Sequence, residues 1–231
     1  MATLRAEHVT MREELERYMR RCDFPRFHMD SHFADPERTL RDHRRTNVSN
    51  TWSTIWLKVW GRETEVAQRH FPRTLALVRA SPLSTAMLSL LEPQRGVWWH
   101  RGFFNGVLRY HVSLLIPPVP PGEPRPRLLV HSQLSHAPDA QPLELGWSDG
   151  SDLLFDDTYN HSVSNPTSLP RVVLFSDVVR QDCPAPLGRW LTFLVHTAAQ
   201  HWPIVNDLFR GAEAASATCV PAAMDGHGRA A

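Results

Sequence analysis

The amino-acid sequence predicts a mainly β protein with flanking helices. Many short stretches carry strand patterns, and turn-forming clusters such as LEPQRG, PPVPPGEPRP and SNPTSLP separate them. The chain has 231 residues, 42% of them hydrophobic, which is enough for one sizeable core. Short strands at this spacing indicate a closed or sandwiched antiparallel sheet.

The first expected elements are a helix and an arm. In residues 5–21, apolar residues recur at helical spacing among Glu and Arg, which predicts an exposed N-terminal helix. Residues 24–50 are polar, rich in histidine and without periodicity, so we expect a loop or a loosely attached arm. Residues 71–79 predict a short helix opened by Pro72.

The strand pattern begins with TWSTIWLKVW at residues 51–60, where the alternation indicates a strand that is at least partly covered on both faces. Further strands are expected at residues 86–91, 96–100, 107–116, 127–133, 152–155, 161–164 and 171–179.

The C-terminal part indicates a helix followed by a tail. Residues 187–209 have a helical pattern in which Pro203 is the expected break, and the low-complexity end predicts disorder. We therefore divide the chain into an N-terminal helix and arm (1–50), a β-barrel domain (51–181), a helical segment (182–211) and a disordered tail (212–231).

Composition excludes several classes of protein. A formal net charge of +1 without a dense Lys/Arg stripe argues against a nucleic-acid partner. The longest apolar run, residues 112–120, is too short for a membrane span, and the N-terminus lacks the apolar core of a signal peptide. The three cysteines are odd in number and scattered, which predicts no disulfide framework. We expect a soluble, cytoplasmic protein; the sequence leaves the oligomeric state open.

Three strand histidines, His100, His111 and His161, are the first candidates for chemistry. A lone histidine in a strand is more often a structural residue than a ligand, so their surroundings matter. His161 follows FDDTYN, and Arg171 comes ten residues later at the head of the apolar strand RVVLFSDVV. A buried cation at such a place is costly unless it meets an anion, and arginine is suited to hold a carboxylate at two points.

Four fragments carry a family resemblance in the same order and spacing. They are SLLEPQRGVWWHRG (89–102), NGVLRYHVSLLIP (105–117), GSDLLFDDTYNHSVSN (150–165) and LPRVVLFSDVVR (169–180). With them, the chain resembles the aspartyl/asparaginyl β-hydroxylase family of Fe(II)- and 2-oxoglutarate-dependent dioxygenases. The resemblance implies a double-stranded β-helix, a jelly-roll or cupin-like barrel.

The resemblance also implies a metal site. His100 and His161 match the two iron-binding histidines of the family, and they would be both the metal ligands and the catalytic centre. Gly102 matches a glycine that the family has where most related dioxygenases place a carboxylate. Iron(II) accepts six ligands, so two histidines leave four positions for 2-oxoglutarate, O₂ and a water.

Further roles follow from the same match. Ser89 and Arg171 match the pair that holds the distal carboxylate of 2-oxoglutarate, and His111 matches another co-substrate contact. Arg109 matches a contact to the substrate carboxylate in the animal enzymes, and it shares a strand face with His111 and Ser113.

Some positions depart from the animal pattern or are expected to be structural. Met87 and Val107 are apolar where two basic residues help to bind the aspartyl substrate in the animal enzymes, and the segment 117–146 is longer. Asp156 and Asp157 are expected to orient a histidine or to cap a turn rather than to bind metal.

The implied function is hydroxylation of an unactivated C–H bond with release of succinate and CO₂, and with ascorbate as a reductant in vitro. The substrate would be small-molecule or peptidyl: the β-carbon of an aspartyl, asparaginyl or related amino acid, free or carrier-bound. Alternatives with the same cofactors are halogenation, desaturation, cyclisation and lipid acyl-chain hydroxylation. A non-catalytic cupin-like binding protein is a third class.

Overall fold

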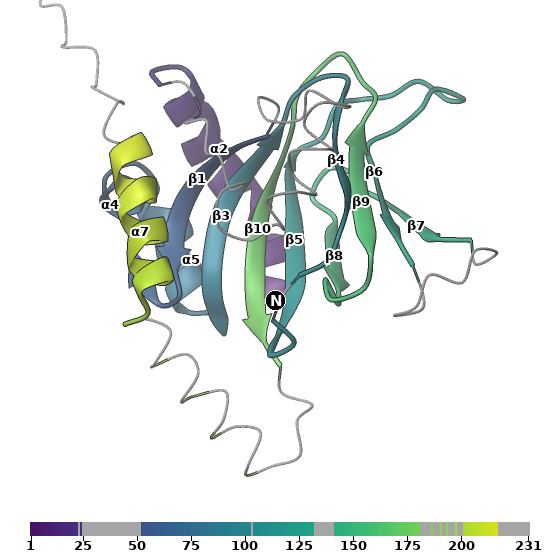
Figure 1. The fold of residues 1–231 in the computed structure, drawn as a ribbon. Coiled ribbons are helices and arrows are strands. Elements are labelled where there is room, and N and C mark those ends of the chain that lie inside the picture. Colours follow the sequence, from purple (N-terminus) through teal and green to yellow (C-terminus); the bar gives the residue numbers. More distant parts are fainter. Residues whose placement is uncertain are drawn as a thin grey trace, which may run out of the picture.

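The computed structural model describes residues 1–22, 24, 52–102, 104–131, 141–180, 186, 190, 193, 197 and 201–216. Two antiparallel sheets form its centre (Figure 1). The larger sheet has the order β2 (Arg62–Glu63), β1 (Trp52–Val59), β3 (Leu83–Leu91), β10 (Arg171–Val179), β5 (Val107–Leu115) and β8 (Asp152–Phe155). The smaller sheet has the order β4 (Arg95–His100), β9 (His161–Asn165), β6 (Arg127–Val130) and β7 (Leu143–Gly146).

The order of the strands identifies the architecture. From β3 to β10 the chain changes sheet at every step except between β6 and β7, which pair directly with each other. This alternation is the double-stranded β-helix, so the predicted fold class is confirmed. The described strands leave β2 and β8 at the edges of one sheet and β4 and β7 at the edges of the other, so the barrel is not closed by hydrogen bonds.

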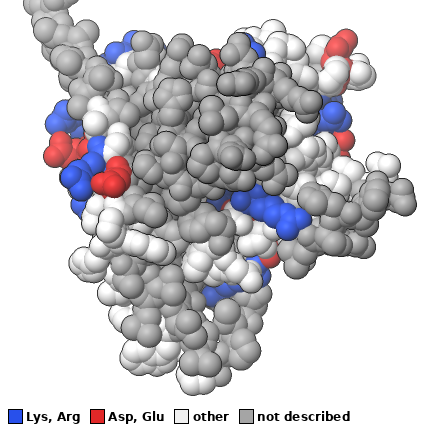
Figure 2. All heavy atoms as spheres, viewed as in Figure 1, with Lys and Arg blue, Asp and Glu red and all other residues white. Residues whose placement is uncertain are grey.

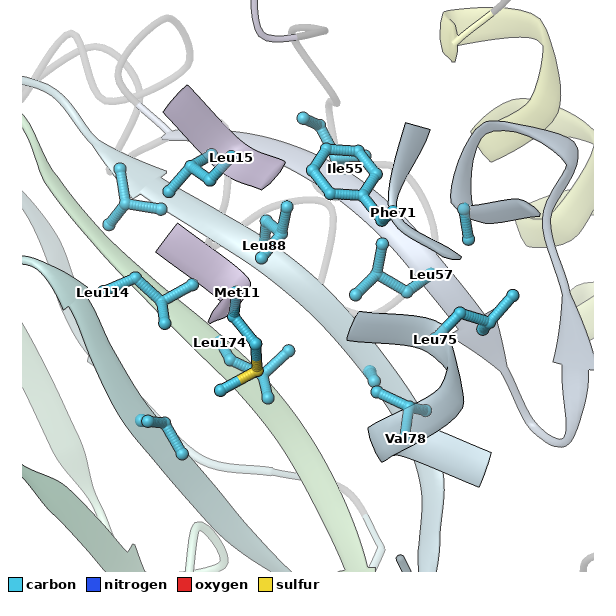
Figure 3. Close-up of a cluster of buried hydrophobic side chains, with 14 of the residues drawn as sticks. Met11, Leu15, Ile55, Leu57, Phe71, Leu75, Val78, Leu88, Leu114 and Leu174 are labelled. Atoms are coloured by element: carbon cyan, nitrogen blue, oxygen red, sulfur yellow. The ribbon is translucent and has the colours of Figure 1, made fainter. Parts of the chain in front are cut away.

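The outer face of the larger sheet is covered by helices near the N-terminus. α1 (Ala2–Ala6) leads into α2 (His8–Met19), and α5 (Pro72–Arg79) lies beside it. Figure 3 shows Leu88, Leu114 and Leu174 of three neighbouring strands pointing toward Met11 of α2 and the α5 side chains. All nine residues of β3 are buried, because one of its faces meets these helices and the other faces the barrel interior.

A buried carboxylate joins α2 to α5. Glu14 is 1% exposed and accepts hydrogen bonds from the backbone N–H groups of Arg73 and Thr74 at 3.0 and 2.8 Å and from Thr74 Oγ1 at 2.7 Å. The first N–H groups of a helix have no partner within the helix, and the helix dipole favours a negative charge there. Glu14 therefore caps α5 from a neighbouring helix.

The opposite face of β1 and β3 is covered by α7 (Pro203–Ser216). Along β3, Met87 packs with Val205 and Ala212 of α7, while its neighbour Leu88 packs under the N-terminal helices. α7 thus lies on the inner face of the larger sheet, beside the region that the smaller sheet covers. Arg62 fixes it by donating to Asn206 Oδ1 at 2.6 Å.

Most expected elements occur, with shifted ends. The strands at 152–155 and 171–179 have the expected bounds, whereas β3 begins three residues early and a break at Glu7 divides the N-terminal helix. β2, α4 (Glu65–His70) and β7 were not expected. β7 was missed because it lies in the stretch interpreted as an insert. Its own residues have no clear strand pattern, and it is a strand because it pairs with β6.

Pro203 begins α7, because the first turn of a helix does not need its N–H groups. The described residues 190, 193 and 197 are helical and residues 201 and 202 form a turn and a bend, so the helical pattern is interrupted at Pro203 as expected. α7 continues to Ser216 through the alanine-rich GAEAAS, so residues 212–216 are helical and not part of a disordered tail. The arm at 25–50, most of 182–200 and residues 217–231 lie outside the described residues. The proposed division of the chain there stays a prediction.

Three expectations from composition concern the cysteines, membrane-spanning segments and surface charge. Cys22 forms a disulfide, which the odd and scattered cysteines did not predict; Cys183 and Cys219 lie outside the described residues. None of the helices that the structure describes is long and apolar enough to cross a membrane. On the face shown in Figure 2, the described basic and acidic side chains are scattered rather than gathered into one extended surface of a single charge.

Candidate metal and co-substrate site

The two predicted metal ligands come together on the smaller sheet. His100 ends β4, His161 begins β9, and the register of these strands places the two residues opposite each other. Their ring centroids are 4.1 Å apart. Each Nδ1 lies beside a backbone carbonyl two residues earlier, Trp98 O at 2.7 Å and Tyr159 O at 2.9 Å. A carbonyl only accepts, so each Nδ1 carries the proton and each Nε2 keeps a lone pair that could bind a metal.

Both rings are neutral at neutral pH, although only His161 is a buried residue. Desolvation, followed by the neighbouring His100 ring, lowers the pKa of His161 to about 3. Loss of surrounding water also lowers the pKa of His100, although part of this side chain remains open to solvent. Neutral imidazole is the form that binds metals. The described residues contain no cluster of three or more His, Cys, Asp or Glu that could hold an ion, so these two side chains stand as a pair.

Gly102 lies against Asp157. The Gly102 N–H donates to the Asp157 carbonyl at 2.7 Å, and a Cβ at position 102 would collide with the Asp157 carboxylate. The space in which a ligand from residue 102 would stand is therefore filled by Asp157, which is 2% exposed. Desolvation raises the pKa of this carboxyl.

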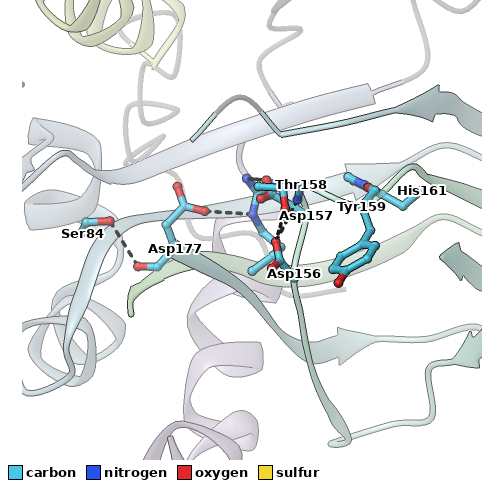
Figure 4. Close-up of polar contacts among 8 residues, drawn as sticks. Ser84, Asp156, Asp157, Thr158, Tyr159, His161 and Asp177 are labelled. Carbon is cyan, nitrogen blue, oxygen red and sulfur yellow. Dashed lines mark hydrogen bonds and ion pairs between the residues drawn. The ribbon is translucent and has the colours of Figure 1, made fainter. Parts of the chain in front are cut away.

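Asp156 and Asp157 have different tasks, although they are adjacent. Asp156 caps the turn as expected, because its Oδ1 accepts from the Thr158 N–H at 3.0 Å and from Thr158 Oγ1 at 2.6 Å. Asp157 points instead toward Asp177 of β10 (Figure 4), with Arg109 between the two carboxylates.

Arg109, the predicted substrate contact, is held by these two acids. Its Nε donates to Asp177 Oδ1 at 2.8 Å and its Nη2 to Asp157 Oδ2 at 2.6 Å. The guanidinium also lies 3.9 Å from the centroid of the Phe175 ring. Arg109 is thus near the histidine pair, but its charge is already balanced by two carboxylates.

Arg171, in contrast to Arg109, has no carboxylate partner among the described residues. It is 3% exposed, and among the described residues its Nε and Nη1 have no hydrogen-bond partner. Burial lowers its pKa to about 9, which leaves the guanidinium charged at neutral pH. An unpaired buried cation is strongly unfavourable, so this position is prepared for an anion.

His111 and Ser89 lie on the same inner face. His111 is 3% exposed, neither ring nitrogen has a partner in the described chain, and burial together with Arg171 holds its pKa well below the usual value. Ser89 on β3 is buried, and its Oγ accepts from Trp52 Nε1 at 2.8 Å. Val173, two residues beyond Arg171, is the β10 partner of Ser89.

The sequence interpretation missed two residues of this site. Trp147 lies over the Arg171 guanidinium at 4.3 Å and stacks with His111 at 6.0 Å between ring centroids. Asp177 binds Arg109. Trp147 stands in LGWSDGSD, which was interpreted only as a turn, and Asp177 was included in an apolar strand. Strand alternation could have identified Asp177, because Arg171 and Asp177 are six residues apart on β10 and therefore lie on one face.

Comparisons with known proteins show which family the chain resembles. A family model described as aspartyl/asparaginyl beta-hydroxylase matches residues 5–181. The ornithine lipid ester-linked acyl 2-hydroxylase of Rhizobium tropici is 32% identical over 194 residues, covering 82% of this chain and 60% of that protein. The aspartyl/asparaginyl beta-hydroxylase of Homo sapiens is 29% identical over 145 residues, covering 60% of this chain and 17% of that protein. The chain therefore spans less than two thirds of either relative.

Among solved structures, an oxidoreductase of the 2OG-Fe(II) oxygenase family from Burkholderia pseudomallei aligns with 55% of this chain and 66% of its own. The TM-score is 0.40 and the identity 10%.

Proposed function

The chain belongs to the aspartyl/asparaginyl β-hydroxylase family, and from that premise we propose that it is an Fe(II)- and 2-oxoglutarate-dependent dioxygenase. The observation that carries the proposal is the buried Arg171, whose Nε and Nη1 have no partner among the described residues, in the same barrel as the His100–His161 pair. Arg171 supplies an anion site, and the histidine pair supplies two imidazole nitrogens that could bind a metal. A keto-diacid that chelates a metal needs both.

The donor set fits the proposed groups. His100 and His161 would hold Fe(II) through Nε2, while Arg171 and Ser89 would hold the distal carboxylate of 2-oxoglutarate. His111, neutral and without a described partner, would contact the same co-substrate. Bound iron, with 2-oxoglutarate and O₂, would supply the oxidation of an unactivated C–H bond, with succinate and CO₂ as co-products.

The residues of the chain would position these groups and exclude water. The carbonyls of Trp98 and Tyr159 orient the two imidazoles. The apolar core between the sheets, which includes Leu128, Val130, Phe155 and Val173, would help to exclude water from the inside of the barrel.

For the substrate, we propose first the β-carbon of an aspartyl, asparaginyl or related amino acid, with Arg109 as its contact. The pairing of Arg109 to two acids means that a substrate carboxylate would have to compete with them. Met87 and Val107, 1% and 3% exposed, are buried apolar residues at the two positions that are basic in the animal enzymes.

Hydroxylation of a lipid acyl chain is the second candidate. The match to the ornithine lipid hydroxylase extends over 82% of this chain against 60% for the human enzyme. Met87 and Val107 also lack the charge that would favour an acidic substrate. Succinate release stimulated by an ornithine lipid but not by an aspartyl peptide would favour this candidate, and the reverse result would favour the first.

The proposal is tested by anaerobic titration of the Fe(II)-loaded protein with 2-oxoglutarate. We expect a visible charge-transfer band, which His100→Ala and His161→Ala abolish and which His201→Ala, at an exposed histidine, leaves unchanged. Substrate-dependent turnover should vanish in the same two variants. Full activity of His100→Ala would refute the assignment, and a wild-type protein without the band would indicate a cupin-like binder. A chlorinated product on adding chloride would indicate halogenation.

A further inference from the structure

Trp147 is the largest side chain against the proposed anion site, where it contacts Arg171. It follows β7, is 4% exposed, and belongs to the core between the two sheets. Its indole N–H is buried and has no hydrogen-bond partner in the described part of the chain. A hydrogen bond therefore does not explain the position of this ring.

Contacts made by the indole ring with Arg171 and His111 explain its position. One contact is with Arg171, whose guanidinium carbon lies 4.3 Å from the ring centroid. The other is with His111, whose ring is nearly parallel at 24° and 6.0 Å away. A cation over the face of tryptophan is attracted by the ring quadrupole, and this attraction grows when water is excluded.

The same ring also separates two spaces. Trp147 lines a cavity of about 590 Å³ together with Ile116, Pro118, Arg125 and Leu169, whereas Arg171 and His111 are not among the residues that line it. The indole is thus a wall between this outer cavity and the barrel interior. It shields the guanidinium from solvent on the side of the cavity.

We propose, on the basis of the proposed function, that Trp147 is a positioning residue for the co-substrate: its indole face orients the Arg171 guanidinium toward the distal carboxylate of 2-oxoglutarate. Arg171 has unpaired N–H groups and no carboxylate partner in the described structure, so the stack with Trp147 takes the place of the ion pairs that orient Arg109. Bidentate recognition of a carboxylate requires the guanidinium to keep one orientation. Stacking on the flat indole would fix that orientation.

The test compares two keto acids in anaerobic, Fe(II)-loaded protein. Both 2-oxoglutarate and pyruvate have the keto-carboxylate group that chelates iron, but pyruvate lacks the distal carboxylate. Each is titrated by the charge-transfer band, with calorimetry as a second measure. We expect Trp147→Leu to weaken 2-oxoglutarate binding at least about tenfold and pyruvate binding less than about twofold, because only the first ligand uses Arg171.

Three further variants complete the design. Trp147→Phe keeps an aromatic face, so its 2-oxoglutarate affinity should stay within about threefold of the wild type. Trp202→Phe, at a tryptophan that is 60% exposed, should change neither ligand. In an Arg171→Met background, Trp147→Leu should cause no additional loss, because the two residues act through one contact. If Trp147→Leu does not fold, Trp147→Met replaces it with an adaptable side chain.

The outcomes are distinguishable. Equal weakening of both keto acids by Trp147→Leu would overturn the proposal, because it would make Trp147 a general packing residue. Unchanged 2-oxoglutarate binding in Trp147→Leu, with a normal wild type, would also overturn it and leave the dioxygenase assignment standing. A wild-type protein that gives no band with either ligand would overturn both.

Discussion

At the scale of single residues, position 102 shows how the backbone limits the metal site. Gly102 lies so close to the Asp157 carboxylate that no side chain fits. We expect Gly102→Ala to lower the free energy of unfolding by about 1–3 kcal/mol, because Asp157 is itself held by Arg109 and cannot move away freely. Urea denaturation measures the change.

The matched control for this prediction is Gly146→Ala, since a Cβ at Gly146 would meet no atom within 4 Å. In an Asp157→Ala background the penalty of Gly102→Ala should shrink, because the colliding carboxylate is gone. Equal losses for Gly102→Ala and Gly146→Ala would contradict the packing described here.

Arg171 leads to a second prediction at this scale. Its buried charge has unpaired N–H groups, so it lowers the stability of the protein without co-substrate. We expect Arg171→Met to raise the free energy of unfolding of the metal-free protein by about 1–4 kcal/mol, the range found when buried ion pairs are replaced by well-packed apolar residues. The same variant should require far more 2-oxoglutarate for turnover.

An exposed arginine is the control for this stability measurement. Arg127 pairs with Glu144 at the surface, and Arg127→Met should change the free energy of unfolding by less than about 1 kcal/mol. A clear loss of stability in metal-free Arg171→Met would mean that the guanidinium is a structural group and not a prepared anion site.

At the scale of elements, Glu14 connects α2 to the start of α5 through three hydrogen bonds. We expect Glu14→Ala to lower the free energy of unfolding by about 2–3 kcal/mol, because the buried donors at Arg73 and Thr74 lose a charged acceptor. Its neighbour Glu13 forms an exposed pair with Arg73, so Glu13→Ala should cost less than about 1 kcal/mol. Similar losses in thermal denaturation of the two variants would count against the capping role.

The elements also show what sequence alone can predict. Strands β8 and β10 were predicted with their bounds, because turn-forming clusters flank them and their own residues have strong strand patterns. β7 has no such pattern and exists through its pairing with β6. Pro203 interrupts the helical pattern as expected, but a local rule does not say that a new helix begins at this proline and continues to Ser216.

The candidate site was likewise predicted only in part. Family resemblance predicted His100, His161, Ser89, His111, Arg171 and Arg109, and the structure brings His100 next to His161 and leaves Arg171 unpaired. The partners of Arg109 and the stack of Trp147 on Arg171 depend on the register between strands and on a loop crossing the barrel. These contacts join residues far apart in the chain, so no local pattern announces them.

At the scale of the whole molecule, burial of neutral histidines makes stability depend on pH. Burial lowers the pKa of His111 well below the value of about 6.5 in an unfolded chain, and that of His161 to about 3. Below about pH 6.5 the unfolded state therefore binds more protons than the folded state, so acid favours unfolding. We expect the metal-free protein to lose stability steadily as the pH falls below this value.

Each such histidine contributes at most about 1.4 kcal/mol per pH unit to this slope. His111→Phe, which suits the aromatic surroundings of Trp147, Phe155 and Phe175, should reduce the slope by up to that amount. Urea denaturation at a series of pH values measures it, and His201→Phe serves as the exposed control. An unchanged slope in His111→Phe would show that this ring is not the buried neutral group described.

The two halves of the candidate site belong to different sheets: the histidine pair to the smaller one, and Arg171 with Ser89 to the larger one. A diacid gripped at both ends would act as a brace across the sandwich. Its arrival would stiffen strands remote from the iron. Its conversion to succinate would weaken the grip at the metal end, because one carboxylate would remain where a carboxylate and a keto oxygen had chelated the ion. The barrel would then loosen with each catalytic cycle, at the moment when the product has to leave.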